Sequence, residues 1–185
     1  MIELMNIKFA TTNQRKLAEA RAACKKYGIE ITQLSLEIDE IQHSDPIAIA
    51  RDKAAKSYEE AGDPVVVTDT AWGIPAINGF PGGYMKDVAG WLEPENFIAL
   101  VARYDDRRIS FTETIVYYDG KEMRVFSEEY MGEIAEVPRG EGNSVEQIAM
   151  FNGRTLAEAH ALGENSHESE DYVWTDFAKW YSTKD

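Results

Sequence analysis

Two groups of carboxylates in the sequence could do chemistry. Asp69 follows three consecutive valines and stands between two threonines. Burial at such a place can raise the pKa of a carboxyl group and fit it to act as a base. The alternative is a carboxylate that stabilises its own loop by hydrogen bonds, and the residues alone leave the two readings about even. Glu37, Asp39 and Glu40 form the second group, which is either a solvated turn or a source of oxygen ligands for Mg²⁺ if Asp69 is its partner.

Polar and basic residues near the start of the chain could bind a phosphate. Thr11-Thr12-Asn13 is a polar turn between a short apolar segment and a predicted helix, and Lys16 follows one turn into that helix. A helix N-terminus offers backbone N–H groups and the positive end of the helix dipole, which suits an anion. From these residues alone, an ordinary helix cap with a solvated lysine is favoured. Lys53 and Lys86, taken singly, are typical of surface lysines.

The elements that must position these residues alternate between strand and helix in the first third of the chain. Residues 7–10 and 29–36 are predicted strands. Apolar residues recur at steps of three and four after Asn13 and after Pro46, which predicts one buried face on each helix. Residues 65–67 are continuously apolar, as in a central strand covered on both faces, and they place Asp69 at the carboxyl end of that strand, where open α/β sheets bind ligands.

The remaining segments carry the turn, strand and helix signals of further elements. They are a loop rich in glycine and proline over 72–84, a helix from Pro94, a hairpin of 108–118 and 121–136, and helices over 155–163 and 170–182. The sum is an α/β fold in which helices flank a mixed central sheet with a long antiparallel hairpin extension. A length of 185 residues suits one domain, assigned to residues 1–185.

Composition excludes several classes of function. The formal net charge is −14, which disfavours binding of an extended nucleic acid but allows a small phosphorylated ligand. Cys24 is the only cysteine, so no intramolecular disulfide forms and a reducing compartment is expected. Neither a leader nor an apolar run of about 20 residues is found, and we expect a cytoplasmic protein away from membranes. Helical zinc signatures, a Walker phosphate loop, a dinucleotide fingerprint and a serine nucleophile elbow are all absent from the sequence.

Taken in order, the segments resemble the inosine-triphosphate (non-canonical purine) pyrophosphatase family. The similar blocks, spread over residues 7–140, are Thr11–Glu19, Glu40–Gln42, Ala50–Ala54, Val67–Thr70, Asn78–Lys86, Gly132–Ile134 and Pro138–Gly140. Any one block is weak, but the ordered set is specific. The resemblance implies Mg²⁺-dependent attack of water on the α-phosphorus of ITP, dITP or XTP, which releases pyrophosphate and a nucleoside monophosphate. It also implies a homodimer with the site in a cleft between two lobes.

The resemblance assigns roles by position. Asp69 and Lys53 would be catalytic: Asp69 activates water or shares the metal with Glu40, and Lys53 contacts phosphate. The substrate-binding positions would be Thr11, Asn13, Lys16, Thr70, Lys86, Glu146, Ser166 and His167. The spacing of Asp69 to Glu40 and Lys53 makes catalysis the better interpretation of this carboxylate.

The C-terminal quarter departs from the family pattern. Where the family has a Phe-Gly-Trp/Tyr-Asp segment that stacks on and reads the base, this chain has Asn143-Ser144-Val145-Glu146. Glu146 is expected to stand in for the aspartate, whereas Val145 cannot stack as an aromatic ring does.

Three further positions differ. Leu162 and Glu168 replace a family lysine and arginine, and Thr68 replaces an acid beside Asp69. Two alternatives to the purine enzyme therefore stay open. One is the same reaction on a pyrimidine or another modified nucleotide, and the other is a nucleotide-binding protein that has lost catalysis.

Overall fold

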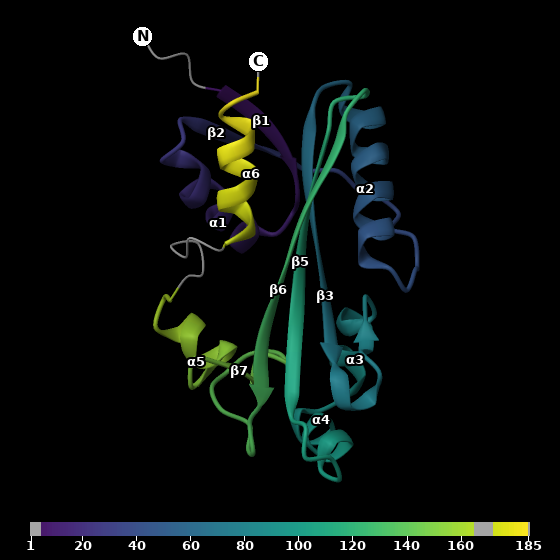
Figure 1. Cartoon of the computed structure of the whole chain (residues 1–185), viewed down its shortest axis with the longest axis vertical. Helices are drawn as coiled ribbons and strands as arrows, with labels where there is room; N and C mark the ends of the chain where they lie inside the picture. The colour runs from purple at the N-terminus through teal and green to yellow at the C-terminus, as the bar shows by residue number, and fades with distance from the viewer. Residues whose placement is uncertain (1–4, 165–171, 185) are drawn as a thin grey trace. The chain divides into compact units, whose positions relative to one another are not determined.

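The computed structural model describes residues 5–164 and 172–184, which fall into two compact units. Unit 1 contains Met1–Asp69, Glu113–Glu128 and Ser166–Asp185, and unit 2 contains Thr70–Thr112 and Glu129–Asn165. Three long strands, β3 (Val65–Ile74), β5 (Arg108–Tyr118) and β6 (Met123–Ile134), contribute residues to both units (Figure 1). The chain therefore passes between the units within strands.

The strands form one mixed sheet in the order β2-β1-β3-β5-β6-β7-β8, with β4 paired to β3. The shorter strands are β1 (Met5–Ala10), β2 (Ile29–Leu34), β4 (Phe80–Gly82), β7 (Ala149–Phe151) and β8 (Arg154–Thr155). β1 runs parallel to β2 and β3, whereas β4 pairs antiparallel with β3 and β7 pairs antiparallel with β6 and β8. The predicted mixed sheet is confirmed, and β5 and β6 form the predicted hairpin around residues 119–122.

Helices cover both faces of the sheet in unit 1: α1 (Gln14–Lys25) and α6 (Val173–Tyr181) on one side and α2 (Pro46–Ala61) on the other (Figure 1). Successive residues of a strand point to opposite faces. On β1, Phe9 meets the ring of Trp174 in α6, while Ala10 joins a buried cluster with Ala50 and Ala54 of α2. The helix-flanked α/β fold is confirmed.

The starts of α1 and α2 follow from side-chain caps that the sequence indicates. The Asn13 side chain accepts hydrogen bonds from the backbone N–H groups of Arg15 and Lys16. Asp45 caps α2 in the same way, with Pro46 as the first helical residue. α2 ends at Gly62, whose φ of 65° lies in the left-handed region that favours glycine.

Unit 2 packs short helices against its part of the sheet. They are the 3₁₀ helix η1 (Pro75–Ile77), α3 (Met85–Trp91), α4 (Pro94–Val101) and α5 (Leu156–Ala161). Its core contains Phe97 and Val101 of α4, Ile109 of β5 and Val145 of the turn before β7. No helix in residues 5–164 and 172–184 is long and apolar enough to cross a membrane.

The predicted end of the third strand was wrong. β3 continues to Ile74 because β4 pairs with it from Trp72 to Ile74, so part of the predicted loop over 72–84 is sheet. Asp69 therefore lies in the middle of β3 and not at its carboxyl end. The parallel pairing with β1 nevertheless stops at Phe9 opposite Val66, so Asp69 lies just beyond the parallel part of the strand.

Other predicted ends of helices and strands differ from those in the structure by a few residues. The second strand ends at Leu34, two residues before the predicted end. The predicted helices over 155–163 and 170–182 correspond to the shorter α5 and α6, and residues 170 and 171 lie outside the described residues. Such shifts are ordinary for boundaries taken from periodicity.

Candidate functional site

The turn before α1 is held by its own side chains. Thr11 Oγ1 accepts the Asn13 backbone N–H at 3.1 Å, and Asn13 Oδ1 accepts the N–H groups of Arg15 and Lys16 at 3.0 and 3.2 Å. The helix cap considered from the sequence is thus present. Phosphate binding by Thr11 and Asn13 stays a prediction, in which this turn orients the start of the helix toward an anion.

Several charged side chains of unit 1 act electrostatically on the Lys16 ammonium group. It is half-buried, and desolvation together with the nearby Lys53 ammonium lowers its pKa, while the carboxylates of Glu113 and Asp69 oppose that shift. Lys16, Lys53 and Asp69 come from α1, α2 and β3, so three elements bring their charges within range of one another.

Lys53 ties Glu40 to the strand that carries Asp69. Its Nζ donates to Glu40 Oε1 at 2.6 Å and to the carbonyl oxygen of Thr68, the residue before Asp69, at 3.5 Å. The Lys53 side chain is 20% exposed and that of Glu40 is 45% exposed. The predicted residues Lys16, Glu40, Lys53 and Asp69 therefore belong to one unit, in which Lys53 contacts Glu40 and the residue before Asp69, and the charges of Lys53 and Asp69 act on Lys16.

The donor set suits Mg²⁺ bound together with phosphate. Mg²⁺ takes one or two carboxylates and completes its shell with water and substrate oxygens. Glu40 and Asp69 supply two carboxylates of this kind near Lys53. Within the part of the chain that the structure describes, no group of three histidine, cysteine or acidic side chains could hold a metal alone. The residues present fit a cation that needs substrate oxygens to complete its coordination.

Glu113 is a residue that the sequence reasoning missed. It lies on β5 and is only 7% exposed, and the charges of Lys16 and Glu19 act on its carboxyl group. Burial raises its pKa to about 7, the carboxylate of Glu19 acts in the same direction, and Lys16 opposes it. A signal was available: Glu113 is the one charged residue in the alternating apolar series Ile109, Phe111, Ile115 and Tyr117.

The other predicted substrate ligands that the structure describes belong to unit 2. Thr70 is half-buried on β3, and Lys86 is exposed in the first turn of α3. Glu146 Oε2 accepts the Asn143 backbone N–H at 3.1 Å, and its Oε1 lies 3.6 Å from His160 Nδ1. Ser166 and His167, together with Glu168, lie outside the described residues.

The turn that carries Glu146 is anchored to α5. The Ala157 N–H donates to the Glu146 carbonyl at 3.0 Å. Thr155 Oγ1 donates to the Arg139 carbonyl at 3.0 Å, and the Arg139 guanidinium lies 3.6 Å from Glu158. The Pro138-Arg139-Gly140 block therefore has a structural role in holding this turn.

The sheet of unit 2 carries a cluster of aromatic side chains, whereas the 143–146 turn carries none. Val145 is 4% exposed in the core. The partly exposed ring of Phe111 stacks on Tyr130 with centroids 4.8 Å apart and meets Trp72 and Phe151 at 5.2 Å each. The expectation that Val145 does not stack on a base agrees with its burial.

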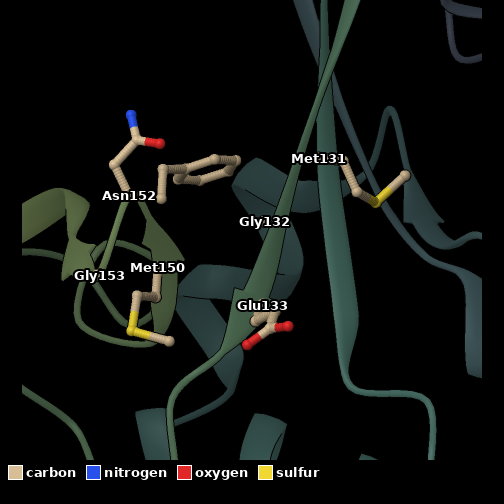
Figure 2. Close-up of a pocket in the computed structure, with 7 residues that line it drawn as sticks. Met131, Gly132, Glu133, Met150, Asn152 and Gly153 are labelled. Carbon is tan, nitrogen blue, oxygen red and sulfur yellow. The ribbon is translucent and has the colours of Figure 1, made fainter.

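A small pocket in unit 2 contains none of the predicted site residues. It encloses about 200 Å³ and is lined by Met131, Gly132, Glu133, Met150, Phe151, Asn152 and Gly153. Figure 2 shows Met131 and Glu133 on one strand, with Met150 and Asn152 across the pocket. With a single carboxylate and two methionines, its lining lacks the cations that a polyphosphate requires.

Comparison with known proteins decides the family. The model of the Ham1 family matches residues 7–169, well over half of the chain. This chain belongs to the Ham1 family. The resemblance inferred from the ordered sequence blocks is confirmed.

Relatives of the Ham1 family cover nearly the whole chain. A dITP/XTP pyrophosphatase of Methanopyrus kandleri is 33% identical over 181 residues, 96% of each chain. A dITP/XTP pyrophosphatase of Pyrobaculum aerophilum is 37% identical over 161 residues, 86% of each chain. The solved Ham1 protein of Staphylococcus aureus, at 20% identity, superposes with a TM-score of 0.76 over 95% of this chain and 97% of its own, which shows the shared fold.

Proposed function

We propose that this Ham1-family chain is a nucleoside-triphosphate pyrophosphatase that hydrolyses non-canonical purine nucleotides such as ITP, dITP and XTP to the monophosphate and pyrophosphate. The observation that carries the proposal is the cluster of Lys16, Lys53, Asp69 and Glu40, assembled in unit 1 from four separate segments. The names of the relatives from Methanopyrus kandleri and Pyrobaculum aerophilum support the same substrate class.

The residues of the cluster have different roles in the proposed reaction. Lys16 and Lys53 neutralise phosphate charge, which lowers the barrier to attack by a nucleophile on a polyanion. Lys53 is held in place by Glu40 and by the Thr68 carbonyl, so its ammonium group is already oriented. Asp69, in the middle of β3, accepts a proton from the attacking water or orients it toward the α-phosphorus.

Mg²⁺ is the proposed cofactor, with Glu40 and Asp69 as its protein ligands. When bound, it supplies further charge neutralisation to the phosphate oxygens. Thr11 and Asn13 are proposed to support the phosphate end of the nucleotide through the start of α1. Thr70, Lys86, Glu146, Ser166 and His167 remain proposed contacts of the rest of the substrate.

A second candidate keeps the reaction and changes the base. The 143–146 turn carries no aromatic side chain, and Val145 is buried in the core, so a stacking partner for a purine is missing at this position. This observation favours relaxed base selection, extending to pyrimidine or other modified nucleotides.

We also propose that the protein works as a homodimer in the cytoplasm, where nucleoside triphosphates are found. Unit 2 exposes several large apolar side chains that such an interface could bury: Trp91 is 77%, Leu162 63% and Val137 61% exposed. Sedimentation equilibrium at micromolar concentration is expected to give twice the chain mass of 20.9 kDa. A species of the single-chain mass across that range rules the dimer out.

A substrate panel tests the proposed function. Pyrophosphate release is measured with Mg²⁺ for ITP, dITP, XTP, the four standard ribonucleotides and a modified pyrimidine triphosphate. We expect kcat/KM for the inosine and xanthosine nucleotides to exceed that for ATP by about tenfold or more, a difference of about 1.4 kcal/mol in transition-state binding. A pyrimidine nucleotide as the best substrate supports the second candidate instead. Inactivity on every nucleotide contradicts both and leaves a nucleotide-binding protein.

A further inference from the structure

The segment of residues 35–45 connects β2 to α2 without a helix or strand of its own, and it carries Glu40. Most of its side chains are exposed, although Leu36 packs against the buried cluster that contains Ala50 and Ala54. A segment with few buried apolar contacts opens locally at a low cost in free energy. The place of Glu40 therefore depends on polar contacts with neighbouring elements.

Two lysines of α2 make such contacts with adjacent residues of the segment. Lys53 Nζ donates to Glu40 Oε1 at 2.6 Å, and Lys56 Nζ donates to the backbone carbonyl oxygen of Asp39 at 2.7 Å. Residues three apart lie on the same face of a helix, so one face of α2 makes both contacts. A hydrogen bond from an ammonium group is stronger than one between neutral groups. The two bonds tie residues 39 and 40 to α2.

Lys56 is itself oriented by the preceding turn of its helix. Its Nζ lies 2.8 Å from Asp52 Oδ2, an i,i+4 pair with the acid on the N-terminal side. Asp52 Oδ2 is shielded from solvent, and the contact is an ion pair and not a directed hydrogen bond. Because this pair already restricts the long lysine side chain, less conformational entropy is lost when Lys56 binds the Asp39 carbonyl.

The two lysine contacts differ in how a bound substrate affects them. In the proposed function Glu40 binds Mg²⁺ and Lys53 contacts phosphate, so the ligands compete for both ends of the bond between these residues. Lys56 and the Asp39 carbonyl have no part in the proposed binding, and their bond persists with substrate present. The Lys56 bond is therefore the contact that holds the backbone beside Glu40 throughout the reaction.

We propose that Lys56 is a positioning residue, which holds the backbone beside Glu40 through the Asp39 carbonyl and so presents the Glu40 carboxylate to Mg²⁺ bound with a nucleoside triphosphate. The inference rests on the proposed function, because it takes Glu40 as a ligand of the metal. Lys56 touches neither the metal nor the substrate. Groups that orient a metal ligand are known to affect metal affinity strongly.

Electrostatics alone predicts the opposite effect for a substitution of Lys56. Removing a positive charge near Glu40 makes the surroundings of the metal more negative, and a cation is then attracted more strongly. A lysine that only stabilises the fold predicts a lower Tm with unchanged Mg²⁺ affinity. Loss of positioning predicts weaker Mg²⁺ binding, so the sign of the change separates the three roles.

Limited proteolysis of the full chain, free of metal and nucleotide, tests the tie itself. A glutamate-specific protease cuts after Glu37 and Glu40 when the segment opens, and mass spectrometry follows these cuts against the cut after exposed Glu141 of unit 2. Lys56→Met is expected to speed the cuts in the segment about three- to tenfold. The matched control is Lys179→Met, which removes a lysine from an exposed ion pair of α6 and leaves these cuts unchanged.

Calorimetry with a non-hydrolysable ITP analogue at a series of Mg²⁺ concentrations measures the effect on the metal. Lys56→Met is expected to raise the half-saturating Mg²⁺ concentration about three- to tenfold, with kcat at saturating Mg²⁺ within about twofold of wild type. Lys56→Arg keeps a charged donor for the Asp39 carbonyl and should restore most of the affinity. Lys56→Gln is too short to reach that carbonyl and repeats the test if Lys56→Met does not fold. Binding of Mg²⁺ to the free analogue is the same for every variant and cancels.

The outcomes separate the inference from the function on which it rests. Faster cleavage and weaker Mg²⁺ binding in Lys56→Met, both absent from Lys179→Met, are the expected results. Unchanged cleavage, or an Mg²⁺ affinity that is unchanged or higher, overturns the positioning role and leaves the proposed function intact. If wild type binds the analogue without any dependence on Mg²⁺, Glu40 is not a metal ligand and the inference is overturned with that assignment.

Discussion

Asp69→Asn is expected to lower kcat by about 10²- to 10⁴-fold, the usual contribution of a positioned general base. The substitution keeps the size and the hydrogen-bonding capacity of the side chain but removes the charge that accepts a proton or holds a cation. Nucleotide binding should persist, because Lys16 and Lys53 remain. Turnover is measured by pyrophosphate release, and binding by calorimetry with a non-hydrolysable triphosphate.

Asp176→Asn is the matched control, since it makes the same change at an exposed position on α6. The control is expected to keep the kcat of wild type. If Asp69→Asn also keeps it, Asp69 has a structural role in β3 and the catalytic assignment is wrong.

Lys16→Met is expected to lower kcat/KM for the triphosphate by about 10- to 100-fold, in line with a lost charge-assisted hydrogen bond of about 1.5–3 kcal/mol. Methionine fills a similar space along the helix without the ammonium group. The loss also leaves the carboxylates of Glu113 and Asp69 without this positive neighbour, so the site repels phosphate more strongly. Steady-state kinetics in excess Mg²⁺ measure the effect.

Lys25→Met is the control for Lys16→Met, because it removes an exposed lysine from the last turn of the same helix. It tests whether the effect comes from general charge or from the position of Lys16. Equal losses in the two variants would show that Lys16 contributes only long-range charge. No loss in either would remove Lys16 from the site.

Local chemistry predicted the elements that begin and end by side-chain signals. Asn13 caps α1, Asp45 with Pro46 starts α2, and Gly62 ends it, as the residue types indicate. These features were predictable because each depends on hydrogen bonds and backbone angles within a few residues.

Long-range pairing produced the features that the sequence did not reveal. β3 runs past Asp69 because residues 80–82 return to pair with it, and no local pattern near Asp69 records that pairing. The neighbours of Glu113 come from a helix about a hundred residues earlier in the chain. Its place in an apolar strand pattern marked it as unusual but did not identify Lys16 as its partner.

The base-recognition segment shows the limit of a family pattern. The sequence showed that Val145 lacks a ring, and the structure adds that this side chain is buried in the core of unit 2. Glu146 is engaged by the N–H of Asn143 and lies near His160. The family therefore supports the hydrolysis more strongly than the identity of the base.

Hydrolysis of ITP in ¹⁸O-labelled water tests the central claim most directly. Attack on the α-phosphorus by a water that Asp69 activates predicts IMP and pyrophosphate as products, with one ¹⁸O atom in IMP and none in pyrophosphate. Mass spectrometry of both products reads the position of the label. Formation of IDP and inorganic phosphate, or label in pyrophosphate, would contradict the account.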